Sequence, residues 1–125
     1  MAERTERFEV TVPAGTAIIA PQTTALTMNP GVTRRAEILV PPGPSGLVGF
    51  RLLHSGTIVI PRSGTKWIIA DDFTFVWDLD GYPVGDRWSL RAYNTDIYDH
   101  TLYVTWHLDE VPASAPTPLA PIPIG

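Results

Sequence analysis

The sequence contains no cysteine. That absence excludes disulfides, thiolate nucleophiles and cysteine-ligated zinc or iron–sulfur sites. Charge is also scarce, because only 18% of the residues are charged, against about a quarter in an average globular domain. Stability must therefore come from side-chain packing, and the sparsely charged surface suggests that neighbouring molecules cover part of it.

Positive charge and long apolar runs are missing as well. Nine Lys and Arg residues stand against 13 Asp and Glu, for a net charge of −4, so no basic field exists to hold a nucleic-acid backbone. The charged start, Met1 to Arg7, is not followed by an apolar signal segment, and no run approaches the roughly 20 residues that cross a bilayer. We expect a soluble, unsecreted product without direct nucleic-acid or membrane partners.

Apolar residues recur with period two, which is typical of strands with one buried face. In Thr101 to Leu108 the apolar side chains alternate with polar ones, and Phe73, Phe75 and Trp77 make every second residue aromatic. The same pattern predicts about eight strands, around Phe8 to Val12, Ala36 to Val40, Leu47 to His54, Thr57 to Ile60, Trp67 to Ala70, Asp72 to Trp77, Trp88 to Asn94 and Thr101 to Leu108.

Turn signals rich in Gly and Pro separate these runs, for example in the segments 41–46 and 80–83. Ser55-Gly56 between two strand patterns predicts a tight hairpin. Regular strands with no helical window predict an all-β fold, an antiparallel β-sandwich or jelly roll, over residues 1–110.

The last segment, residues 111–125, has a different composition. It contains five prolines and no charge, so it fits neither a ladder nor a helix, and we expect an extended, polyproline-like arm. Because Leu119, Ile122 and Ile124 make it apolar, we expect it to dock on a neighbour.

Two acidic segments could carry chemistry. Asp78-Leu79-Asp80-Gly81 resembles the opening of a calcium loop, but Tyr82 and Ser89 occupy positions where an EF-hand needs oxygen ligands. We interpret these carboxylates as solvated turn residues and predict no metal or cofactor.

The loop Asn94 to His100 gathers Asp, Tyr and His side chains between two strong strand patterns. It is either a functional loop, with Asp96 and Tyr98 as candidate contact residues, or a compact turn in which Asn94, Asp96 and Asp99 accept backbone N–H bonds. We favour the turn.

The four tryptophans could serve as sugar-stacking platforms. Trp77, Trp88 and Trp106 are in phase with apolar neighbours, which indicates core positions. Trp67 follows Lys66 near a turn, so we expect it to be exposed and count it as a candidate interface residue.

Catalytic patterns are weak. The serines lack the Gly-x-Ser-x-Gly frame of a nucleophile elbow, and the three histidines form no His-x-x-x-His pair. Paired carboxylates for glycoside hydrolysis stay open, since their separation is spatial. We predict a protein that is not an enzyme.

The segments Val40 to Phe50, His54-Ser55-Gly56, Gly81-Tyr82-Pro83 and Tyr93 to Asp96 resemble small β-rich structural proteins of tailed bacteriophages, over about residues 8–109. The resemblance implies a virion component, a capsid decoration (cement) protein or a tail component. Its partners would be further copies of itself and other virion proteins, such as the major capsid protein or tail proteins. The alternative is a tail or adhesion component that binds a host-surface glycan. The candidate interface residues are Leu119, Ile122, Ile124, Trp67, Asp96 and Tyr98.

Overall fold

The computed structural model describes residues 3–61, 67–79 and 88–110. These ranges form nine β-strands: β1 (Glu3–Val12), β2 (Gln22–Ala25), β3 (Gly31–Val40), β4 (Val48–His54), β5 (Thr57–Ile60), β6 (Ile68–Ile69), β7 (Phe73–Asp78), β8 (Trp88–Asn94) and β9 (His100–Glu110). The predicted all-β class is confirmed. Within the same ranges, the structure contains no helix long and apolar enough to cross a membrane.

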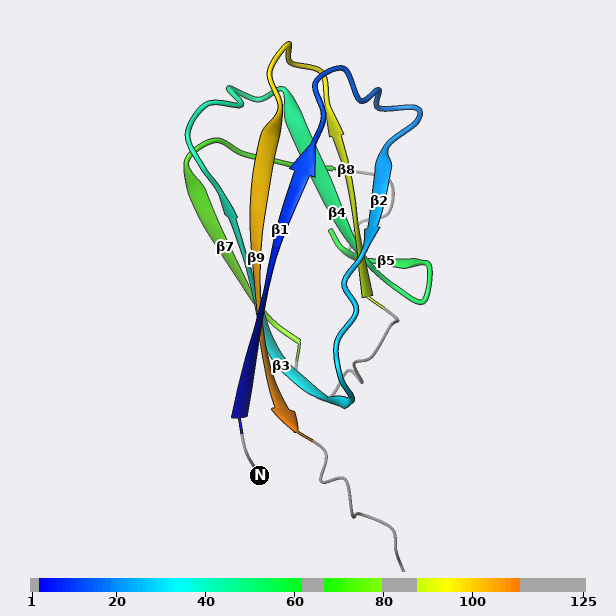
Figure 1. The fold of residues 1–125 in the computed structure, drawn as a ribbon, viewed down its shortest axis with the longest axis vertical. Coiled ribbons are helices and arrows are strands. Elements are labelled where there is room, and N and C mark those ends of the chain that lie inside the picture. The colour runs from blue at the N-terminus through cyan, green and yellow to red at the C-terminus, as the bar shows by residue number, and fades with distance from the viewer. Residues whose placement is uncertain (1–2, 62–66, 80–87, 111–125) are drawn as a thin grey trace, which may run out of the picture.

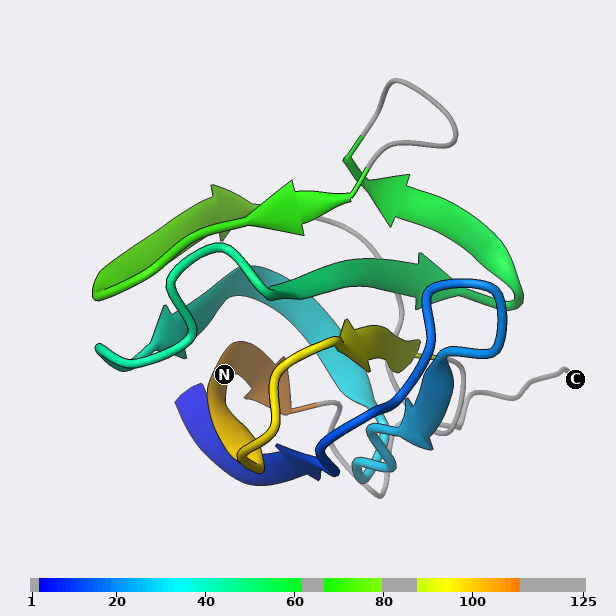
Figure 2. The same ribbon diagram turned by 90° about the horizontal axis from the view of Figure 1, so that it is seen from above.

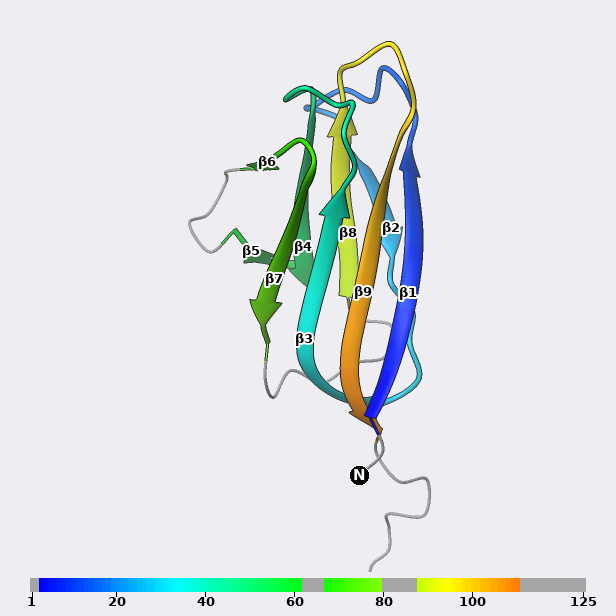
Figure 3. The same cartoon turned by 90° about the vertical axis from the view of Figure 1, so that its left-hand side faces the viewer.

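Two antiparallel sheets make up the fold. The first has the strand order β1-β9-β3-β7, and the second has the order β2-β8-β4-β5, with β6 also paired to β4. Figure 3 shows the first sheet in front, from β1 on the right to β7 on the left, with the second sheet behind it.

The pairing follows one long hairpin rolled up on itself. Its innermost pair is β4–β5, and the pairs β3–β7, β2–β8 and β1–β9 lie successively further out. The roll is closed by two further pairs, β3–β9 and β4–β8. This arrangement of two packed antiparallel sheets is a jelly roll. The topology thus decides between the two architectures that the sequence left open.

The innermost turn has a local cause. Ser55 and Gly56 both have positive φ, at 52° and 81°, which is the backbone of a type I′ turn and matches the twist of the flanking strands. The predicted tight hairpin is confirmed.

The core lies between the two inner faces. Trp88 and Trp106 are both fully buried, and their ring centroids are 4.7 Å apart. The indole N–H of Trp106 donates to Thr33 Oγ1 over 3.1 Å, so this buried donor is paired. Trp77 packs against this core from its margin, and the core positions predicted for these three tryptophans are confirmed.

Strand β2 was not predicted. Its residues, Gln-Thr-Thr-Ala, carry no alternation of apolar and polar side chains, and the strand exists because its backbone pairs with β8. The predicted arm over residues 111–125, with Leu119, Ile122 and Ile124, lies outside the described residues, as does Asp80 of the acidic turn.

Candidate functional site: the loop end

Three loops meet at one end of the sandwich, and we call them together the loop end. They are residues 13–21 between β1 and β2, residues 41–47 between β3 and β4, and residues 95–99 between β8 and β9. Figure 1 shows them at the top of the molecule, and in Figure 2 they face the viewer. Pro and Gly residues in the first two loops end the strands there.

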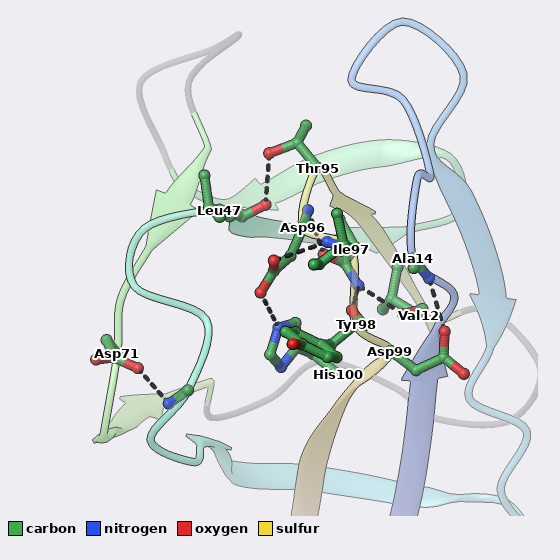
Figure 4. A network of polar contacts seen from close by, with 12 residues as sticks. Val12, Ala14, Leu47, Asp71, Thr95, Asp96, Ile97, Tyr98, Asp99 and His100 are labelled. Atoms are coloured by element: carbon green, nitrogen blue, oxygen red, sulfur yellow. Dashed lines mark hydrogen bonds and ion pairs between the residues drawn. The ribbon is translucent and has the colours of Figure 1, made fainter.

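The loop end is built around Asn94, whose side chain is fully buried. Its Nδ2 donates to the carbonyl oxygens of Val12, at 3.0 Å, and Tyr98, at 2.8 Å. Its Oδ1 accepts from the backbone N–H of Asp96 at 2.9 Å. One amide side chain therefore connects the end of β1 to the loop between β8 and β9. Figure 4 shows the polar contacts of this region.

Two carboxylates complete the same loop. Asp96 accepts from the backbone N–H of Ile97 at 2.7 Å and from His100 Nε2 at 2.7 Å. The hydrogen bond from His100, and then that from Ile97, hold the pKa of Asp96 below its ordinary value. Asp99 accepts from the backbone N–H of Ala14 at 2.8 Å. The compact-turn interpretation of this loop is confirmed.

Backbone bonds join the loops to one another. The N–H of Gly15 donates to the carbonyl of Asp96 at 3.1 Å, and the N–H of Thr95 donates to the carbonyl of Leu47 at 2.9 Å. The N–H of Gly43 donates to the carboxylate of Asp71, in the connection that precedes β7, at 2.9 Å. The loop end is consequently a hydrogen-bonded frame rather than three independent loops.

Large apolar side chains project from this frame into solvent. Their exposed fractions are 96% for Ile19, 79% for Ile97, 67% for Tyr98, 46% for Ile18 and 40% for Leu47. A single exposed apolar residue is ordinary, but here all three loops contribute. The loop end is therefore a surface with exposed apolar side chains on a backbone that hydrogen bonds hold in place.

Among the interface residues predicted from sequence, Asp96 and Tyr98 come together at the loop end. Trp67 lies elsewhere, on the outer face of the second sheet, where its ring meets that of Tyr93 edge-on at 4.9 Å. The guanidinium of Arg51 covers its ring at 3.9 Å. Trp67 is half-buried, so the expectation that it is exposed is wrong. The cause is packing: Gly49 has no side chain, which lets Tyr93 lie flat over β4 and support Trp67.

The outer face of the first sheet has two shallow hollows. One, of about 180 Å³, is lined by Arg35, His107 and other charged residues, and one of about 270 Å³ is lined by Leu39, Tyr103 and polar neighbours. Both are smaller than the roughly 300 to 1,000 Å³ of typical small-molecule sites. His107 Nε2 lies 2.9 Å from Glu37 Oε2 beside them, within hydrogen-bonding distance.

Sequence reasoning missed most of the exposed apolar residues of the loop end, namely Ile18, Ile19, Leu47 and Ile97. One signal was present in the sequence. Ile18-Ile19 stands between Ala and Pro residues, outside every period-two pattern, and an apolar pair in a Pro- and Gly-bounded loop has no strand face to bury it.

No protein-family model matches the chain, and no curated protein matches it. Among solved structures, the crystal structure of FLHE shares 12% identity at a TM-score of 0.50, covering 88% of this chain and 100% of that one. A tobacco streak virus coat protein dimer shares 11% identity at a TM-score of 0.50, covering 95% and 90%. The chain is thus an all-β sandwich protein with a fold similar to that of a viral coat protein, and at these identities the likeness concerns the fold alone.

Proposed function

We propose that the chain is a non-enzymatic structural protein of a virion, and specifically a capsid decoration (cement) protein that contacts its neighbours through the loop end and the C-terminal arm. The observation that carries the proposal is the set of apolar side chains on the loop end, mounted on a hydrogen-bonded frame. The similarity of several segments to β-rich phage proteins supports the virion as the location. The division into a sandwich unit, residues 1–110, and an arm, residues 111–125, belongs to the same proposal.

The energetics favour an assembly contact. Burying a large apolar side chain completely contributes roughly 1.5 to 3 kcal/mol, and Ile19 and Ile97 are almost entirely available for burial. A single contact of this size is weak after the cost of association. Repetition of the contact over a lattice would make it effective, and a rigid frame reduces the ordering cost of each contact.

Catalysis has little support in the described geometry. The two hollows on the outer sheet face are shallow and smaller than typical small-molecule sites. The carboxylate of Asp96 is occupied by hydrogen bonds that close its own loop. Its lowered pKa keeps it ionised at neutral pH, where a general acid would need the opposite shift.

Co-sedimentation with capsid particles from the same source tests the proposal. The wild-type chain should pellet with the particles and saturate at a fixed copy number. A loop variant, Ile19→Asp with Ile97→Asp, should lose most of the binding, while Val76→Asp is the matched control, because Val76 is 55% exposed on β7 outside the loop end. Wild-type chain that stays in the supernatant at every concentration would contradict the proposal.

A second candidate is a tail or adhesion component that binds a host-surface glycan. The observation in its favour is Tyr98, which is 67% exposed and presents an aromatic side chain of the kind that stacks on sugars. Glycan-array binding that is lost in Tyr98→Ala would support it. Binding that is lost in Trp67→Ala but kept in Tyr98→Ala would place the sugar on the outer face of the second sheet instead.

A further inference from the structure

We propose that the loop end of one copy binds the C-terminal arm, residues 111–125, of a second copy, so that the chains join head to tail. The proposal rests on the proposed function, because it names the partner of the same apolar surface. Three properties of the molecule carry it: the charge of the two segments, the place where the arm begins, and the length of the arm.

The two segments match in charge and polarity. Residues 13–21 and 41–47 of the loop end contain no charged side chain, and neither does the arm. In the third loop, Asp96 and Asp99 accept hydrogen bonds from their own frame. The loop end carries neither Lys nor Arg, so an anionic surface such as a nucleic acid or a lipid headgroup layer would find no counter-charge there. An uncharged apolar segment is the partner that it fits.

The arm begins at the opposite end of the molecule. Strand β9 starts at His100, directly after the loop end, and runs to Glu110 at the far end, as the orange arrow of Figure 1 shows. The point at which the arm begins and the loop end therefore lie at opposite ends of the molecule. That placement is the one required for head-to-tail contacts.

The arm is too short to place its apolar residues on the loop end of its own chain. The strand from Glu110 back to His100 spans about 34 Å at roughly 3.4 Å per residue, and the loops lie beyond His100. The chain from Glu110 to Leu119 covers only about 30 Å when fully extended. Leu119 cannot reach the loop end of its own chain, so an arm that places Leu119, Ile122 and Ile124 together on a loop end must belong to a different copy.

A contact of this kind uses two different surfaces and is heterologous. Repeated between identical subunits, it closes into a ring when the rotation per step allows and otherwise continues as a chain. Either form would let each subunit hold the next one around a particle surface.

A complementation experiment with two full-length variants tests the proposal. The arm variant carries Leu119→Asp, Ile122→Asp and Ile124→Asp, and the loop variant carries Ile19→Asp and Ile97→Asp. Light scattering over a series of concentrations should find that the wild-type chain forms oligomers and that each variant alone is monomeric. An equimolar mixture should contain dimers and nothing larger, since the mixture combines one intact arm with one intact loop end.

The Val76→Asp control should oligomerise as the wild type does, and circular dichroism should show the same β-signal for all variants, because the substituted sandwich residues are exposed. A mixture that remains monomeric while the wild type oligomerises would overturn the head-to-tail contact, as would a monomeric wild type. Either result leaves the particle co-sedimentation unaffected, so failure of this proposal and failure of the proposed function are separable.

Discussion

Replacing Asn94 with aspartate changes the side chain least in shape and most in hydrogen bonding. The amide Nδ2 that donates to the carbonyls of Val12, at 3.0 Å, and Tyr98, at 2.8 Å, becomes a carboxylate oxygen with nothing to donate at neutral pH. The acceptor bond from the N–H of Asp96 at 2.9 Å can persist. Asn94→Asp therefore isolates the two donated bonds.

The expected cost follows from the burial of the site. Each donated bond contributes about 1 kcal/mol net, and a buried carbonyl left without a partner costs about 1 to 3 kcal/mol. Asn94 is fully buried, so a charge facing two carbonyl oxygens adds to this loss. We expect a decrease in the free energy of unfolding of about 3 to 5 kcal/mol at pH 7, which corresponds to a fall in Tm on the order of 10 to 20 °C for a domain of this size.

Urea unfolding of both proteins at a series of pH values measures the effect. A protonated aspartic acid at position 94 can donate one bond again, so the stability difference between variant and wild type should shrink as the pH falls toward 4 and grow as it rises. Thr95→Ala is the control, because its hydroxyl makes one exposed bond to Leu47, and it should cost less than about 1 kcal/mol. A loss below about 1 kcal/mol for Asn94→Asp at pH 7 would refute the central role of this amide.

Substitutions at three further positions test other parts of the structure. Gly49→Ala would place a methyl group against the Tyr93 ring and should cost about 1 to 3 kcal/mol by overpacking, with a change in near-ultraviolet circular dichroism; an unchanged spectrum and stability would contradict that packing. Thr33→Val removes the hydroxyl that accepts the buried indole N–H of Trp106 at 3.1 Å and should lower the free energy of unfolding in urea by about 1 to 3 kcal/mol. Thr33→Ser keeps the hydroxyl and should retain most of the stability. Because the pKa of Asp96 is lowered in the folded state, ionised Asp96 stabilises the fold at pH values above its ordinary pKa of 3.8, and this stability is lost as the pH falls through the lower folded pKa. Asp96→Asn should therefore flatten the acid limb of the plot of stability against pH. An acid limb as steep as the wild type's would show that the hydrogen bond from His100 contributes nothing.

The alternation of side chains predicted most of the fold. In Thr101 to Leu108, period two identified the buried face on which Trp106 lies, because a strand with one face in the core must alternate. The turn chemistry of Ser55-Gly56 predicted the innermost hairpin, because a type I′ turn needs two residues that tolerate positive φ. The local hydrogen bonds of Asn94 and Asp96 were also predictable, since each accepts from a backbone N–H one or two residues further along the chain.

Other features depend on contacts between segments far apart in the sequence. Strand β2 has no pattern of its own and forms because β8 offers it a free edge. Trp67 was expected to be exposed, but Tyr93 and Arg51 cover it from strands that the local sequence does not reveal.

The sequence by itself determined the strand class, the inward faces and the local turns, because these follow from side-chain alternation and from backbone preferences within a few residues. Only the tertiary structure decided that the rolled hairpin is a jelly roll and that Ile19, Leu47 and Ile97 share one end of it. The physical reason is that sheet order and loop proximity are set by packing two apolar faces against each other, and this packing joins residues such as Val12 and Asn94 that are distant along the chain.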